Sequence, residues 1–481
     1  MSISGAMNNA LLGLTAAGRS VEVVANNVAN STTEGYAPRD IVLQSQSTGG
    51  VRVASVTRRA DAAIISDRQL ADASLANSQT RADGLQRIED AIGLPTDGNS
   101  LSARLAAFDR SVIEAASQPD SENRLLAVLR SAQDLTRSFA SVSDTVQQTR
   151  VDADTQISRE VDRLNAAITN VDDLNNQIVI FKNSGRDSSS LIDQRQQAID
   201  QITELVPVQS LERSDGRISL YTKRGAALVD AQPATFAFTR TGYITPDMTL
   251  TSGGLSGLTL NGQDINISSE NGPISGAKLS ALFAVRDEIA PDAQTTLDAV
   301  ARDLVERFQD PAVDPTLASG DAGFFTDRGG VFDPADEIAL SSRLQVNSAV
   351  RVEDGGETWR IRDGVNATAQ GNVGDATLLY AMTDVLAVGR APASGPNAGI
   401  NSTPEGLIAE LTSVIATERQ DLDLQVTFER TRSSELRAQE LSGGVDTDEE
   451  MQKLLLIEQA YAANARVVQT LDDLLQQILR I

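Results

Sequence analysis

The chain has 481 residues, enough for about two to four domains at roughly 100–200 residues each. Its 41 Lys and Arg against 66 Asp and Glu give a formal net charge of −25, which disfavours binding to nucleic-acid backbones or anionic membranes. It contains neither Cys nor His, and this excludes disulfides, zinc fingers, thiol nucleophiles and the Ser-His-Asp triad.

The start of the chain predicts an amphipathic helix that ends at a turn-forming stretch. Its first positive side chain is Arg19, and Asn8, Asn9 and Gly13 interrupt its apolar residues, so a cleaved secretory signal is not expected. Residues 30–38 contain turn formers that break the helix. The apolar side chains at helical spacing are Met7, Leu11, Leu14, Val21, Val24 and Val28.

The end of the chain predicts a second helix with a narrow heptad seam. Thr447 and Glu450 fit a capping box at its start, with Thr447 as N-cap. Because a seam one residue wide needs another helix to cover it, we expect a coiled coil. Asn464 either specifies the register of that coil or faces a solvated gap. The seam positions are Leu454, Ile457, Tyr461, Asn464, Val468, Leu471, Leu475 and Ile478.

The middle of the chain alternates between helical and β-like patterns. Helices are expected at about 60–92, 100–117, 121–182, 278–309 and from 403 onwards, with a short helix at 191–205. Period-two spacing and Gly-rich turns over 206–280 predict an antiparallel β-rich unit. Residues 310–400 are rich in Gly, Asp and Pro, and a strand is expected around residues 359–361.

The two ends carry motifs that resemble those of the flagellar rod, hook and hook-associated axial proteins. The N-terminal motif is Ala25-Asn26-Asn27-Val28-Ala29-Asn30 followed by Thr33-Glu34-Gly35-Tyr36, in which Glu34 stands where the family often has Pro. Its motif residues are Asn26, Asn27, Asn30, Gly35 and Tyr36. The C-terminal motif spans residues 444–450 and 458–470. Helical patterns over residues 60–182 resemble the hook-associated members, because rod and hook proteins are mostly β in their middle.

The resemblance implies a structural adaptor at the hook–filament junction, outside the cell. It implies a ring of identical subunits that contacts the hook protein and hook-associated protein 3, export through the flagellar type III apparatus, and a chaperone that covers the C-terminal helix. No nucleic acid or membrane partner is expected. The alternatives are another axial protein, namely hook-associated protein 3 or the hook protein, and a glycan-acting module that uses carboxylates in residues 206–400.

No catalytic, cofactor-binding or metal-binding residues are predicted. The acidic residues 446–450 do not have the spacing of an EF-hand loop, and helix capping accounts for them. Residues 272–278 lack the Gly-Lys step of a phosphate-binding loop. We therefore expect a protein that is not an enzyme.

The expected fold class is α+β, with terminal coiled-coil helices, a long-helix bundle and inserted antiparallel β-rich units. The expected divisions are an N-terminal helix and turn (1–38), a helical domain (39–205), a β-rich domain (206–280), a helical return (281–309), a small β or irregular outer domain (310–400), a closing helix (401–442) and a C-terminal coiled-coil helix (443–481).

Overall fold

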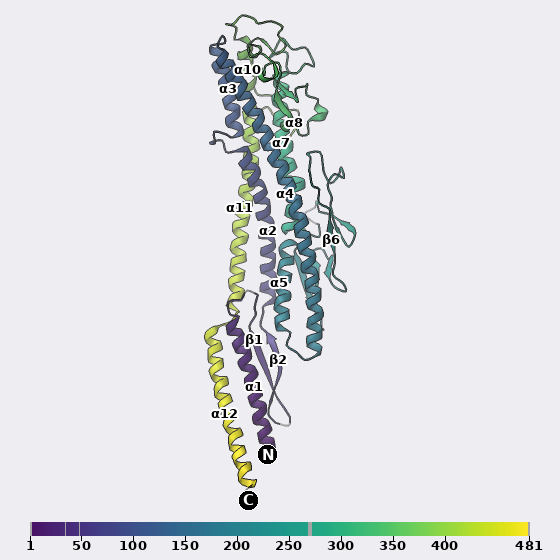
Figure 1. Cartoon of the computed structure of the whole chain (residues 1–481), viewed down its shortest axis with the longest axis vertical. Helices are drawn as coiled ribbons and strands as arrows, with labels where there is room; N and C mark the ends of the chain where they lie inside the picture. The colour runs from purple at the N-terminus through teal and green to yellow at the C-terminus, as the bar shows by residue number, and fades with distance from the viewer. Residues whose placement is uncertain (1, 34, 48, 268–271, 480–481) are drawn as a thin grey trace.

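The computed structural model describes residues 2–33, 35–47, 49–267 and 272–479, so Glu34 of the N-terminal motif and the last two residues lie outside it. The molecule is elongated and consists of two parts that meet end to end (Figure 1). The lower part holds both termini, and the upper part is a shaft of long helices with small sheets on its side and tip. The expected α+β class is confirmed. Among the described residues, no helix is long and apolar enough to cross a bilayer.

The lower part is a pair of antiparallel helices with a hairpin beside them (Figure 1). Its elements are α1 (Ile3–Ala29), α12 (Thr447–Leu479), β1 (Arg39–Ser45) and β2 (Val51–Arg58). The tip of the hairpin packs tightly on α1, because a Cβ atom at Gly50 would lie 2.9 Å from Cδ1 of Leu12. The two ends of the chain therefore lie side by side, as their narrow apolar stripes indicate.

Long helices that begin at well-defined caps form the shaft. The side chain of Asp61 accepts hydrogen bonds from the first turn of α2, and Thr403 caps α11, which has Pro404 at its first position. The longest helix, α4, has 62 residues and is roughly 90 Å long at 1.5 Å per residue. The shaft helices are α2 (Ala62–Ile92), α3 (Leu101–Ser117), α4 (Glu122–Asn183), α5 (Ser189–Leu205) and α11 (Pro404–Ser442).

The expected helix over residues 278–309 is interrupted by one wide turn. It consists of α6 (Lys278–Ala284), a π-turn (Val285–Ile289) and α7 (Ala290–Phe308). Pro291 lacks an N–H, and its ring would clash with the carbonyl one turn earlier in a regular helix. The π-turn just before α7 is wider and gives the ring the space that it needs.

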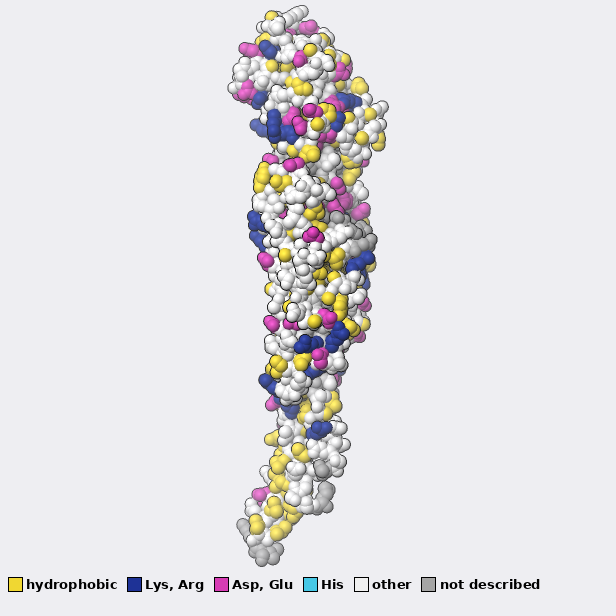
Figure 2. Space-filling model, turned by 90° about the vertical axis from the view of Figure 1, so that its right-hand side faces the viewer, with side chains coloured by type: hydrophobic (Ala, Val, Ile, Leu, Met, Phe, Trp, Pro, Cys, Tyr) yellow, Lys and Arg dark blue, Asp and Glu magenta, His cyan; other side chains and the backbone are white. Residues whose placement is uncertain are grey.

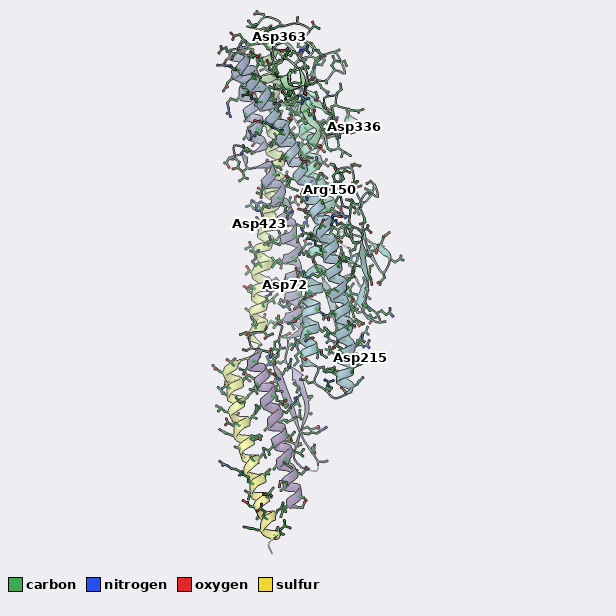
Figure 3. The ribbon with its side chains drawn as sticks, in the orientation of Figure 1. Asp72, Arg150, Asp215, Asp336, Asp363 and Asp423 are labelled. Atoms are coloured by element: carbon green, nitrogen blue, oxygen red, sulfur yellow. The ribbon has the colours of Figure 1, made fainter. Side chains whose placement is uncertain are left out.

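The β-rich unit over residues 206–280 lies on the side of the shaft and is antiparallel, as expected. It contains two three-stranded sheets, with strand orders β3-β4-β5 and β6-β7-β8. Buried Arg150 of α4, labelled in Figure 3, donates to the backbone carbonyls of Thr245 and Met248 and so anchors this unit. The strands are β3 (Val208–Glu212), β4 (Ile218–Thr222), β5 (Ala227–Val229), β6 (Phe236–Phe238), β7 (Leu258–Leu260) and β8 (Gln263–Ile265).

Residues 310–400 form the tip of the shaft and contain more helix than expected. The strand expected around Trp359 is wrong, because residues Arg360–Asp363 form the short helix α9, which ends at Gly364 with φ +111°. The tip also contains β9 (Phe325–Asp327), α8 (Leu340–Arg343), β10 (Leu344–Val346), α10 (Thr377–Ala387) and two 3₁₀ turns at Pro334–Asp336 and Val352–Asp354.

The tip shares its hydrophobic core with the upper shaft. Phe108 of α3 and Phe308 of α7 pack against Phe324 and Phe325, with ring centroids 5.1–6.0 Å apart. A second core joins α4 and α5 of the lower shaft to the β-rich unit. The delimitation of residues 310–400 as a separate domain stays a prediction.

Candidate assembly interface

The two terminal helices meet along a stripe of small side chains on α1. Because Gly13 has no side chain, Asn464 can approach closely, and a Cβ atom at Gly13 would lie 2.7 Å from Nδ2 of Asn464. The amide of Asn464 donates to the carbonyl of Ala460 in its own helix at 3.0 Å. Asn464 thus lies at the seam against Gly13, and its role in specifying the register stays a prediction. The stripe on α1 has three- and four-residue spacing and consists of Ala10, Gly13, Ala17, Ser20, Val24 and Asn27.

The predicted seam residues divide into a partly covered group and an exposed group. Val24 is buried, and Met7, Leu14, Val28, Leu454, Ile457, Asn464, Val468 and Leu471 are half-buried. Leu11, Val21, Tyr461, Leu475 and Ile478 are exposed, and Leu11 keeps 49% of its surface. The α1 seam is thus shifted from the large residues of the predicted stripe toward small ones, and several large side chains remain open to solvent. Hydrophobic side chains are visible on the narrow lower end of the molecule (Figure 2).

A single buried asparagine connects the terminal helices at the top of the lower part. Asn27 is 0% exposed, and its Nδ2 donates to Oε2 of Glu450 at 3.0 Å and to the carbonyl of Arg39 at 2.9 Å. Its Oδ1 accepts from the Tyr36 hydroxyl at 2.8 Å and from the Arg39 N–H at 3.0 Å. Both donors and both acceptor positions of the amide are therefore used. Burial is the main cause that raises the pKa of Tyr36, which stays a neutral donor.

Glu450 has a different role from the one its capping-box spacing predicts. The N-cap of α12 is Asp446, whose carboxylate accepts from the N–H groups of Asp448 and Glu449 at 2.9 and 3.1 Å. The assignment of Thr447 as N-cap is therefore wrong. Glu450 is only 3% exposed and turns toward α1, where it accepts from Asn27, while its other oxygen accepts from Lys453 at 2.8 Å.

An ion-pair cluster ties this joint to the shaft. Asp193 of α5 accepts from Arg39 at 3.1 Å and from Arg58 at 2.7 Å, so one carboxylate holds both ends of the hairpin. Gly35 (φ +78°) approaches the same helix, since a Cβ atom there would lie 3.1 Å from Cγ of Gln197. The closing turn between the lower part and the shaft is fixed to α5 by these contacts.

A second cluster holds the end of α11 near the joint. Arg68 of α2 donates to Glu440 of α11 at 2.7 Å and to Asp200 of α5 at 2.8 Å. It also contacts Asp72, labelled in Figure 3, at 3.0 Å. Burial opposes the charge of Arg68, but the carboxylates of Asp200 and Glu440 outweigh it and raise the pKa of the guanidinium. This cluster brings α2, α5 and α11 together next to the α11–α12 connection.

Family models match both ends and the shaft. The model of the flagellar hook-associated protein FlgK helical domain matches residues 85–323, that of the flagella basal body rod protein matches residues 7–36, and that of the flagellar basal body rod FlgEFG protein C-terminal matches residues 442–481. The flagellar hook-associated protein 1 of Bacillus subtilis is 23% identical over 97% of this chain and 96% of its own length. That of Escherichia coli is 22% identical over 100% of both chains.

The chain is similar to flagellar hook-associated protein 1 along its whole length. It is a structural component of the bacterial flagellum. A solved structure titled as the flagellar hook junction protein FlgK from Burkholderia pseudomallei superimposes with a TM-score of 0.45 and 17% identity, over 54% of this chain and 46% of that one.

The N-terminal motif residues fall into four positions. Asn27 and Tyr36 form the centre of the joint, and Gly35 gives the close approach to α5. Asn30 follows the last residue of α1, where its amide donates to the carbonyl of Asn26 at 2.9 Å. Asn26 itself is exposed. The structure thus gives a physical reason for four of the five motif residues.

Three functional residues of the joint were not predicted from sequence. The spacing of Glu450 predicts a capping role, and no local sequence pattern marks Asp193 or Lys453 as part of a site. The only available signal for Asp193 was its place in a hook-associated-like stretch, residues 191–195. Among the described residues, no group of three or more acidic side chains is arranged to hold a metal ion.

Proposed function

We propose that this chain forms the junction between hook and filament as a ring of identical subunits. It would contact the hook protein on one side and hook-associated protein 3 on the other. It would leave the cell through the flagellar type III apparatus without a cleaved signal peptide and act there without any catalytic step. The names of the full-length relatives and the matches at both termini support this position.

The observation that carries the proposal is the open apolar flank of α12. Large side chains on α12 remain exposed beside the seam with α1, and Leu456 keeps 66% of its surface. Fully burying one such side chain contributes about 1.5–3 kcal/mol. A neighbouring subunit would supply the missing wall. The open flank consists of Leu455, Leu456, Val467, Leu474 and Ile478.

Deletion of the gene tests the position in the flagellum. We expect cells with hooks but no filaments, and flagellin shed into the medium, when imaged by electron microscopy. Reintroduction of the unaltered chain restores filaments. Normal filaments on the deletion strain would contradict the proposal.

A point variant tests the open flank itself. Leu456→Glu places a charge on the exposed face, so the stability of the free chain changes by less than about 0.5 kcal/mol, as is usual for surface substitutions. We expect that this variant does not restore filaments in the deletion strain. The matched control is Leu211→Glu on β3, which is also exposed but lies on the side of the shaft. Restoration by both variants would contradict a role of the flank.

The same flank is where we propose that an export chaperone binds before secretion. An amphipathic helix with an exposed aliphatic face fits a hydrophobic groove on a partner. Deletion of residues 450–481 should abolish co-purification of the chaperone, while Leu211→Glu should keep it. Retained binding after the deletion would contradict this part.

A further inference from the structure

A groove with an apolar floor and an acidic rim lies high on the shaft, between α2, α7 and α11. Its volume is about 460 Å³. Leu85, Ile289 and Leu411 are among the apolar residues that line it. Its acidic residues are Glu288, Asp292, Glu410 and Glu418, and its one basic lining residue is Arg81, so acidic side chains outnumber basic ones four to one. The groove thus has room for a few aliphatic side chains with cations beside them.

The π-turn before α7 forms one wall of this groove. Glu288 and Ile289 come from the π-turn and Asp292 from the turn that follows it. Desolvation by burial raises the pKa of Asp292, which means that its charged form lacks compensation there. Glu410 is exposed and forms no ion pair with a described residue. An incoming cation would therefore be stabilised at this rim.

The β1–β2 hairpin carries the complementary surface. Residues 39–59 contain four arginines and one aspartate, and because Asp193 holds Arg39 and Arg58, the cations that the hairpin presents are Arg52 and Arg59. Arg52 and Arg59 are exposed. The pairing register shifts between Val42 and Leu43, and both side chains stay exposed, Leu43 by 48%. The hairpin therefore presents aliphatic side chains beside cations.

The hairpin cannot reach the groove of its own chain. It ends next to Ala62, where α2 begins, and it extends away from the shaft (Figure 1). Leu85 lies 23 residues further along α2, which corresponds to roughly 35 Å of helix. Any contact between the two surfaces is therefore made by two different molecules displaced along the long axis.

We propose that the β1–β2 hairpin of one copy of this chain docks into the acidic-rimmed groove between α7 and α11 of a neighbouring copy. This inference rests on the proposed function, because a tubular array supplies copies displaced along one axis. Val42 would enter the apolar floor, and Arg52, which pairs with Gln44 on the same face of the hairpin as Val42, would face Glu410 and Glu418. The contact is heterologous, since one surface of each copy meets a different surface of the next.

Chemical cross-linking tests the contact, because the chain has no native cysteine. Leu43→Cys and Val414→Cys, combined in the full-length chain, place one thiol on the hairpin and one at the groove. Flagella from the complemented deletion strain are treated with a short bismaleimide. We expect dimers and larger products, with a yield at least about tenfold above each single variant. The control pair is Leu43→Cys with Leu211→Cys, since Leu211 is also exposed.

A charge exchange tests the same contact through the cross-link yield. Glu410→Arg with Glu418→Arg should lower the cross-link yield about tenfold, and the further change Arg52→Glu should restore most of it. Equal yields in the test and control pairs, or no recovery on charge exchange, would overturn the docking. If filaments form normally while the cross-link is absent, the docking is wrong and the proposed function stands. If the deletion strain itself bears normal filaments, the proposed function fails.

Discussion

Asn27 and Glu450 are 423 positions apart in the sequence and share a buried hydrogen bond of 3.0 Å. The asparagine comes from the N-terminal motif and the glutamate from the first turn of the C-terminal helix. Because the amide also binds Tyr36 and both backbone groups of Arg39, one side chain fixes the positions of α1, α12 and the hairpin. The joint is thus assembled from parts that fold together only when the chain ends meet.

The first prediction concerns this amide. Asn27→Ala removes all four hydrogen bonds and leaves the buried carboxylate of Glu450 with Lys453 alone, so we expect a loss of about 1–3 kcal/mol. Amide exchange should accelerate in residues 27–40 and around residue 450, and filament formation should decrease. The matched control is Asn26→Ala, which changes an exposed neighbour. Equal exchange in both variants would show that the joint does not depend on this amide.

The long helices could be predicted from sequence because their apolar periodicity extends over many turns. The seam on α1 could not be predicted, since it consists of small residues such as Ala10, Gly13 and Ser20. A search for large apolar side chains at helical spacing identifies Leu11 and Val21 instead, and both are exposed. Small residues are selected there by close approach of the partner helix, which is a property of tertiary packing.

Two other sequence predictions, the strand around Trp359 and the N-cap at Thr447, are wrong for local reasons. A short apolar alternation such as that around Trp359 does not distinguish a strand from a single helical turn, and Gly364 ends that turn in a backbone conformation favoured by glycine. The acidic start of α12 fits two capping arrangements that differ by one residue. Because Asp446 caps α12, Glu450 does not act in a capping box and instead faces Asn27. These two residues are 423 positions apart, so no local sequence pattern predicts their contact.

The second prediction concerns the close approach of the terminal helices. Gly13→Val introduces a side chain where even a Cβ atom would lie 2.7 Å from Asn464, so the pair should separate locally at a cost of about 1–3 kcal/mol. Exchange of α1 amides would report it. Gly18→Ala is the control, because no atom lies within 4 Å of its Cβ position, and this variant should stabilise α1 by about 0.5–1 kcal/mol. A destabilised Gly18→Ala would contradict the assignment of the faces.

The third prediction is a pH dependence at the groove. Because burial raises the pKa of Asp292, its contribution to stability is fully present below the unfolded carboxyl pKa and is lost as the pH rises through the raised value. Asp292→Asn removes this loss, so the variant should be more stable than the unaltered chain at pH 7 and lose that advantage near pH 3.5. Denaturant unfolding at both pH values measures it, with Asp173→Asn on the exposed face of α4 as control. An advantage of Asp292→Asn that is the same at both pH values would contradict the burial argument.

The last prediction concerns the state of the terminal helices before assembly. The seam on α1 consists largely of small side chains, and the larger residues Leu456 and Leu474 of α12 keep 66% and 43% of their surface exposed. Since an isolated helix pair depends on apolar burial, we expect residues 1–30 and 450–481 to exchange their amides much faster than α4 in dilute monomer. In isolated flagella the same segments should become protected, because neighbouring copies cover them. Strong protection of both ends in the monomer would mean that the chain completes its own terminal core, and the argument for assembly through the open flank of α12 would be lost.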